Sequence, residues 1–230
     1  MTSCLTKNSK TIMSIDFTTD CPKRRAGTPC KYCYVECARN IGFNAKKVIP
    51  YLAYKGEVKK MKQAKIDSLN STGGLRMFSF GDYMPEHDFD IEQLLDDCYS
   101  IGLKAKAITK QVDFVTKFVN HPAISVIHVS VDNVEQGVDW ELAKSLRAQY
   151  PDKVRIRCVI MNDEDIAILD EKVGIDVFTF NHGRGLKQYG WKKYSKTEVQ
   201  KRTPELGGRV CCFTGNCTTC ELKCAVGGNA

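Results

Sequence analysis

The residues most able to do chemistry in this sequence are its cysteines, and most of them lie in two tight groups. The chain has 230 residues, of which 12 are cysteine. One group lies within residues 21–37 and the other within residues 211–224. So many cysteines in a chain without an apparent secretory signal indicate metal or redox chemistry rather than a disulfide framework. The isolated Cys98 and Cys158 fit the alternative of buried thiols acting as small hydrophobic side chains.

The first group has the spacing of ligands to an iron–sulfur cluster. Cys30 and Cys33 form a C-x-x-C pair in a glycine- and proline-punctuated loop, and eight residues separate Cys21 from Cys30. A 4Fe–4S cluster normally takes four thiolates. If only these three cysteines serve, one iron keeps an open position for a small chelating ligand, which is typical of a reactive site.

Two closed arrangements of the same loop are alternatives. Cys37 lies four positions after Cys33 and therefore on the same face of a predicted helix. With Cys21, Cys30 and Cys33 it could complete a structural zinc site or a fully ligated electron-transfer cluster. Either arrangement would remove the open iron.

The loop from Cys21 to Tyr34 resembles the cluster-binding loop of radical S-adenosylmethionine (SAM) enzymes, whose common form is C-x-x-x-C-x-Φ-C with Φ aromatic. Tyr32 occupies the aromatic position. The longer first gap departs from the common form and is similar to that of small, phage-type outlying members. The resemblance implies a SAM-binding 4Fe–4S cluster, whose reduction cleaves SAM to methionine and a 5′-deoxyadenosyl radical. It also implies an electron donor such as flavodoxin or ferredoxin.

The resemblance further points to residues that would hold SAM. In the superfamily a glycine-rich turn after the second strand contacts the amino group of SAM, and Gly81-Asp82 occupies that place here. We expect an exposed Asp82 carboxylate that accepts from the SAM ammonium, with an ordinary Gly-Asp turn as the alternative. Later candidates are Ser130 and Asp132 for the ribose or carboxylate of SAM, Lys110 and Arg157 for its carboxylate, and Asn181 for its adenine or ribose. Each of these could instead be a helix cap or a polar core residue.

The C-terminal group predicts a second metal site. Its ligand candidates, in a C-x4-C-x2-C-x3-C pattern, are Cys212, Cys217, Cys220 and Cys224. Such gaps occur in iron–sulfur ligand runs and in zinc ribbons. We expect an auxiliary 4Fe–4S cluster, because radical-SAM enzymes often contain one, with zinc as the alternative. Cys211 could replace Cys212 as a ligand.

The rest of the chain alternates strands and helices, which predicts an α/β fold with a parallel sheet. We expect strands at 14–17, 75–80, 105–109, 124–131, 154–160 and 177–180. The intervening helices are expected at 34–47, from Pro50 to 70, and at 90–102, 112–120, 139–149 and 163–172. Polar residues follow the strand ends, as in parallel barrels. We therefore predict a partial (β/α)6 barrel over residues 1–185, with a cysteine-rich extension over 186–230, and keep an open doubly wound sheet as the competitor.

Composition favours an intracellular protein with no membrane partner, and we expect a cytoplasmic location. The net charge is +7, and much of it lies between Lys46 and Lys65. This segment supports a rival function, a nucleic-acid-binding zinc or iron–sulfur protein without SAM chemistry. A non-catalytic electron carrier is a third possibility. The substrate of the enzyme is not identified by any motif, although an open barrel mouth could admit a macromolecule.

Overall fold

Six parallel strands form one sheet in this protein, in the order in which they occur along the chain. The computed structural model describes residues 5–7, 13–18, 21–22, 56–78, 81–131, 138–160, 162–170, 174–180, 192, 194–207 and 210. The parallel strands are β2 (Met13–Ile15), β3 (Leu75–Met77), β4 (Ala105–Thr109), β5 (Ile124–Val131), β6 (Val154–Ile160) and β7 (Val177–Phe180). A further short strand, β1 (Thr6–Lys7), pairs antiparallel with β2.

The strand order distinguishes a barrel-like sheet from a doubly wound one. A doubly wound sheet reverses its strand order at a switch point, where it binds its ligand. From β2 to β7 each strand instead pairs with the next strand in the chain, without any reversal. The prediction of an α/β fold with six parallel strands in a partial barrel is confirmed, and the doubly wound competitor was wrong.

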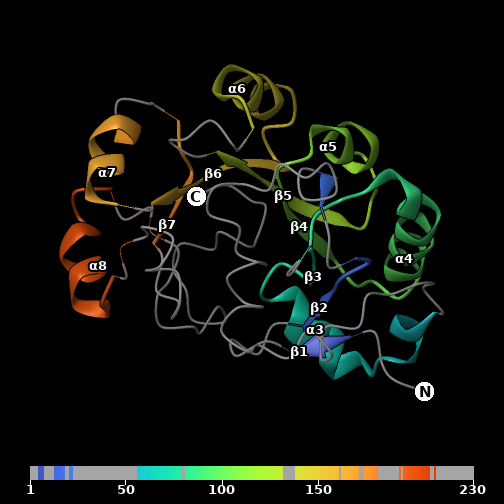
Figure 1. Ribbon diagram of the computed structural model, residues 1–230. Coiled ribbons are helices and arrows are strands. Elements are labelled where there is room, and N and C mark those ends of the chain that lie inside the picture. The colour runs from blue at the N-terminus through green and yellow to red at the C-terminus, as the bar shows by residue number, and fades with distance from the viewer. Residues whose placement is uncertain are drawn as a thin grey trace.

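Helices cover one face of this sheet. They are η2 (Glu57–Lys60), α3 (Gln63–Asn70), η3 (Pro85–His87), α4 (Asp88–Ser100), α5 (Val112–Phe118), α6 (Trp140–Gln149), α7 (Asp163–Asp170) and α8 (Lys196–Arg202). Figure 1 shows α4, α5, α6 and α7 as an outer arc around the strands. None of the described helices combines the length and apolar character that crossing a bilayer requires.

The face of the sheet toward the helices is apolar. In register across it lie Ile15, Met77, Ala107, Ile127 and Val154, all of them fully buried. Because side chains alternate between the two faces of a strand, each strand contributes every second residue to this packing. The helix side of the half-barrel is therefore its main hydrophobic core.

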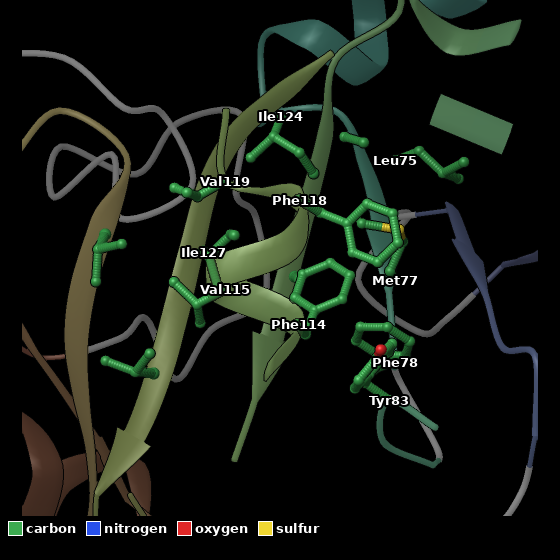
Figure 2. Close-up of a cluster of buried hydrophobic side chains, with 14 of the residues drawn as sticks. Leu75, Met77, Phe78, Tyr83, Phe114, Val115, Phe118, Val119, Ile124 and Ile127 are labelled. Atoms are coloured by element: carbon green, nitrogen blue, oxygen red, sulfur yellow. The ribbon is translucent and has the colours of Figure 1, made fainter. Parts of the chain in front are cut away.

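Aromatic side chains seal this core near the carboxyl end of β3. The Phe114 ring on α5 lies 4.9 Å from the Phe78 ring, 5.5 Å from the Tyr83 ring and 5.2 Å from the Phe118 ring, between centroids. Figure 2 shows these rings packed beside Met77, Val115 and Ile127. Full burial of such a side chain stabilises the fold by about 1.5–3 kcal/mol.

The helix expected from Pro50 to residue 70 is interrupted in its described part. Turn η2 ends at Met61, whose backbone is extended, and α3 starts only after the extended Lys62. The Lys59 ammonium lies 2.5 Å from the buried carboxylate of Asp97 on α4. Tertiary packing of η2 on α4 therefore overrides a continuous helix, which the lysine-rich sequence predicted.

Residues beyond 185 extend the barrel core. Tyr194, Val199 and Leu206 are buried in the same hydrophobic cluster as the strands, and the Tyr194 ring lies 4.9 Å from the Phe180 ring of β7. After α8 the chain returns to the sheet, where Val210 forms a parallel bridge with Phe178. Part of the segment that we predicted as an extension thus continues the βα pattern of the core.

Candidate functional site

The cysteine candidate that the structure describes lies just after the first parallel strand. Cys21 is a half-buried residue six positions beyond Ile15, where β2 ends. Several other predicted site residues lie outside the described part of the chain: Cys30, Tyr32, Cys33, Asp132, Asn181, Cys212, Cys217, Cys220 and Cys224. Among the described residues no group of three or more His, Cys, Asp or Glu side chains is arranged to hold a metal ion.

Asp82 joins the turn after β3 to the end of β4. Its carboxylate accepts hydrogen bonds from the Thr109 hydroxyl at 2.5 Å, the Lys110 amide at 3.0 Å and the Tyr83 amide at 2.8 Å. The Gln111 side-chain amide adds a longer contact at 3.5 Å. The expectation of an exposed Asp82 was wrong, because the strand ends converge on it and supply its donors.

The environment of this carboxylate is desolvated as well as hydrogen-bonded. Burial raises the pKa of Asp82 above its usual value, while the bonds from Thr109, Lys110, Tyr83 and Gln111 act in the opposite direction. The donors favour the ionised form, and loss of water disfavours it. Asp82 is therefore an internal tie between β3 and β4, with its hydrogen-bonding capacity largely used by the protein.

The turn that contains Gly81 is also fixed at its start. Phe78 has a φ of 58°, which is uncommon for a residue with a side chain. Its ring is buried against Phe17 and Phe114, and its amide donates to the Ile15 carbonyl at 3.2 Å. A non-glycine residue keeps this conformation only where surrounding contacts over-determine it. The backbone after β3 is thus held at both ends, by Phe78 and by Asp82.

The structure brings two other predicted residues together on the inner face of the sheet. Ser130 of β5 and Arg157 of β6 are partners in the parallel register. Both point away from the apolar, helix-covered face, because their strand neighbours Val129 and Ile156 lie in that core. Lys110, by contrast, meets Asp82 through its backbone amide at the end of β4.

The inner face carries more polar residues than the sequence reading identified. They share the alternate positions of the strands, opposite the apolar face: Ser14, Arg76, Lys106, His128, Arg155 and Thr179. The sequence signal for these residues was the alternation of apolar and polar residues along a strand. In β6, for example, the segment Val-Arg-Ile-Arg-Cys alternates buried apolar residues with half-buried arginines. A closed barrel would fill this side with branched apolar side chains.

Some of these inner-face cations are bonded at the amino-terminal end of the sheet. The Lys106 ammonium donates to the Thr72 carbonyl. The Arg155 guanidinium donates to the carbonyls of Pro151 and Val154. These two charges are thus held by backbone oxygens below the middle of the sheet.

A second polar cluster ties the chain after β7 to α7. The Asp163 carboxylate accepts from Lys192 at 2.6 Å, from Arg202 of α8 at 2.8 Å and from the Tyr194 hydroxyl at 3.2 Å. The hydrogen bond from Lys192 is the main cause that lowers the pKa of Asp163. Because all these partners lie on the helix side, this cluster stabilises the docking of α8.

Comparison with known proteins does not assign a family. No family model matches the chain, and no curated protein has a significantly similar sequence.

Proposed function

We propose that this protein is a radical-SAM enzyme. The observation that best supports the proposal is the position of Cys21, which follows β2, the first parallel strand of the six-stranded half-barrel, by six residues. Parallel barrels gather their reactive groups at the carboxyl ends of their strands. The C-x8-C-x2-C loop begins at that edge, next to the turn that Phe78 and Asp82 hold after β3.

The half-buried position of Cys21 fits a metal ligand better than the position of Cys98 does. Cys98 is fully buried on α4, and burial raises the pKa of its thiol to about 12. A thiolate, not a thiol, binds metal, so Cys98 is unsuited to this role. A bound 4Fe–4S cluster would supply the electron for reductive cleavage of SAM, with flavodoxin or ferredoxin as the electron source. The chain itself would position SAM and exclude water.

We assign Asp82 a positioning role toward SAM. Its carboxylate already serves three close donors, so it would act on SAM by fixing the turn after β3. Replacing Asp82 with Asn should weaken SAM binding and lower the melting temperature together. If SAM affinity fell with the melting temperature unchanged, Asp82 would be a direct ligand instead.

The C-terminal cysteine group would bind an auxiliary 4Fe–4S cluster, or zinc. Val210 precedes Cys211 directly and pairs in parallel with Phe178 of β7. The chain therefore enters the group while running toward the carboxyl edge of the sheet, the same edge as Cys21.

The proposal can be tested by anaerobic reconstitution of the full chain with iron and sulfide. We expect about eight irons per chain from two clusters of four. The electron paramagnetic resonance spectrum of the reduced protein should change on addition of SAM, and 5′-deoxyadenosine should form. A colourless zinc protein that shows none of these signals would overturn the enzyme and favour the rival nucleic-acid-binding function.

Cysteine variants sharpen this test. The triple Ala variant of Cys21, Cys30 and Cys33 should retain about half of the iron and cleave no SAM. Cys98→Ala is the matched control, since it removes a thiol that the structure buries in the core. Cys37→Ala should keep both iron and cleavage. Loss of the cluster in Cys37→Ala would show a closed site without an open iron.

A further inference from the structure

Three side chains whose hydrogen-bond donors have no partner among the described residues lie close together on the inner face of β5, β6 and β7. Ser130 and Arg157 are register partners. Thr179 pairs with Val159, which is two residues beyond Arg157 on the same face of β6. Neighbouring strands lie about 4.8 Å apart and rise about 3.3 Å per residue. The two hydroxyls therefore flank the strand position of the guanidinium, one on each side.

The side chains of this trio make no hydrogen bond or ion pair within the part of the chain that the structure describes. The Thr179 hydroxyl oxygen is buried and lacks a hydrogen-bond partner there. Buried polar groups are nearly always hydrogen-bonded, and an exception needs an explanation such as a missing ligand. Arg155, by comparison, lies on the same strand and the same face but donates to two backbone carbonyls.

The donor set fits an oxyanion. A guanidinium offers two parallel N–H groups that match a phosphate or carboxylate. The hydroxyls of Ser130 and Thr179 add one donor each. Four donors spread over three strands suit a phosphate, whose oxygens point in several directions, better than a planar carboxylate.

We propose that Ser130, Arg157 and Thr179 bind a phosphate group of the substrate. This inference names the substrate class of the proposed SAM enzyme and rests on that function for its biological meaning. It replaces the roles that the resemblance implied, which were the SAM ribose or carboxylate for Ser130 and the SAM carboxylate for Arg157. A SAM molecule that chelated the open iron would have its carboxylate near the cysteine loop after β2, and β6 is the fourth strand beyond β2 in the sheet.

Phosphate binding to the purified full chain tests the proposal directly, with isothermal titration of inorganic phosphate as the measurement. Arg157→Gln should weaken binding roughly ten- to a hundredfold, as expected for loss of charge-assisted hydrogen bonds. Arg155→Gln is the matched control, with the same charge change on the same strand and face, and should weaken binding less than about threefold. Equal losses in the two variants would overturn the proposal, because only general electrostatic attraction would remain.

Thr179→Val keeps the test decisive if the arginine variant folds poorly. Valine has nearly the shape of threonine, so the variant should keep or raise the melting temperature without phosphate and still weaken phosphate binding several-fold. A lower melting temperature would show that the hydroxyl has a protein partner, which contradicts the proposal. Tighter binding of acetate than of phosphate would also contradict it.

The outcome is separable from that of the proposed function. Phosphate binding that depends on Arg157, in a protein that holds no cluster and cleaves no SAM, would support this site and overturn the enzyme. SAM binding that depends on Arg157, in a protein that does not bind phosphate, would return Arg157 to the SAM carboxylate and overturn this site.

Discussion

The two faces of the sheet share one hydrogen-bond ladder and differ in almost everything else. The face toward the helices is built from residues such as Met77, Ile127 and Ile156, which are fully buried in one core. The inner face of the same strands carries Arg76, His128 and Arg157. A closed barrel packs both sides, whereas this half-barrel packs one side and keeps polar groups on the other. The difference shows that stability and ligand chemistry are divided between alternate residues of each strand.

The largest effect should be the difference in stability between alanine variants of Ile156 and Arg157, two neighbours on β6 that face opposite sides of the sheet. Ile156→Ala removes a fully buried side chain and should lower the free energy of unfolding by about 2–5 kcal/mol. Arg157→Ala should change it by less than about 0.5 kcal/mol, because the guanidinium has no partner among the described residues. Urea denaturation of the two variants measures both values. Similar losses would break the comparison, since Arg157 would then be part of a packed interior.

A smaller effect on stability is expected from variants of Asp82, whose carboxylate joins the turn after β3 to the end of β4. Asp82→Ala leaves the donors on Tyr83, Thr109 and Lys110 without their acceptor and should cost about 1–3 kcal/mol of stability. Asp82→Asn should cost less, because its amide oxygen still accepts a hydrogen bond. Urea denaturation again provides the measurement. Two variants as stable as the wild type would mean that the turn after β3 does not depend on this carboxylate.

The smallest effect should be the pH dependence of stability that Asp163 and its cationic partners cause on the helix side of the sheet. Lys192 and Arg202 lower the pKa of Asp163 in the folded state, so the unfolded chain binds its proton more readily. The ion pairs therefore stabilise the protein above the unfolded pKa of about 3.9, and this contribution is lost as the pH falls below it. Because these side chains are partly exposed, it should amount to about 0–1 kcal/mol.

Melting temperatures measured between neutral and acidic pH test this expectation. The wild type should lose more stability on acidification than Asp163→Asn, which lacks the titrating group. Parallel pH profiles would show that the cluster is screened by solvent and does not hold α8 in place.

Much of the fold was predictable, because local pattern and tertiary packing agree in the later strands. The bounds of β4, β5, β6 and β7 match the expected ones, where β-branched residues crowd short segments. Strand β3 ends earlier than expected, at Met77, because Phe78 turns into the left-handed region. Helix α8 was missed although Ser195 and Glu198 form a capping box, which is a readable signal. Strand β1, with two residues, is too short to show a period.

What the sequence determined by itself was the α/β alternation and the parallel sheet. These depend on residue types and spacings within a few positions of one another. Only the tertiary structure decided that Asp82 ties two strands together and that Ser130, Arg157 and Thr179 share one face. The register between strands brings together residues that are 27 and 22 positions apart in the chain, and no local pattern encodes that register.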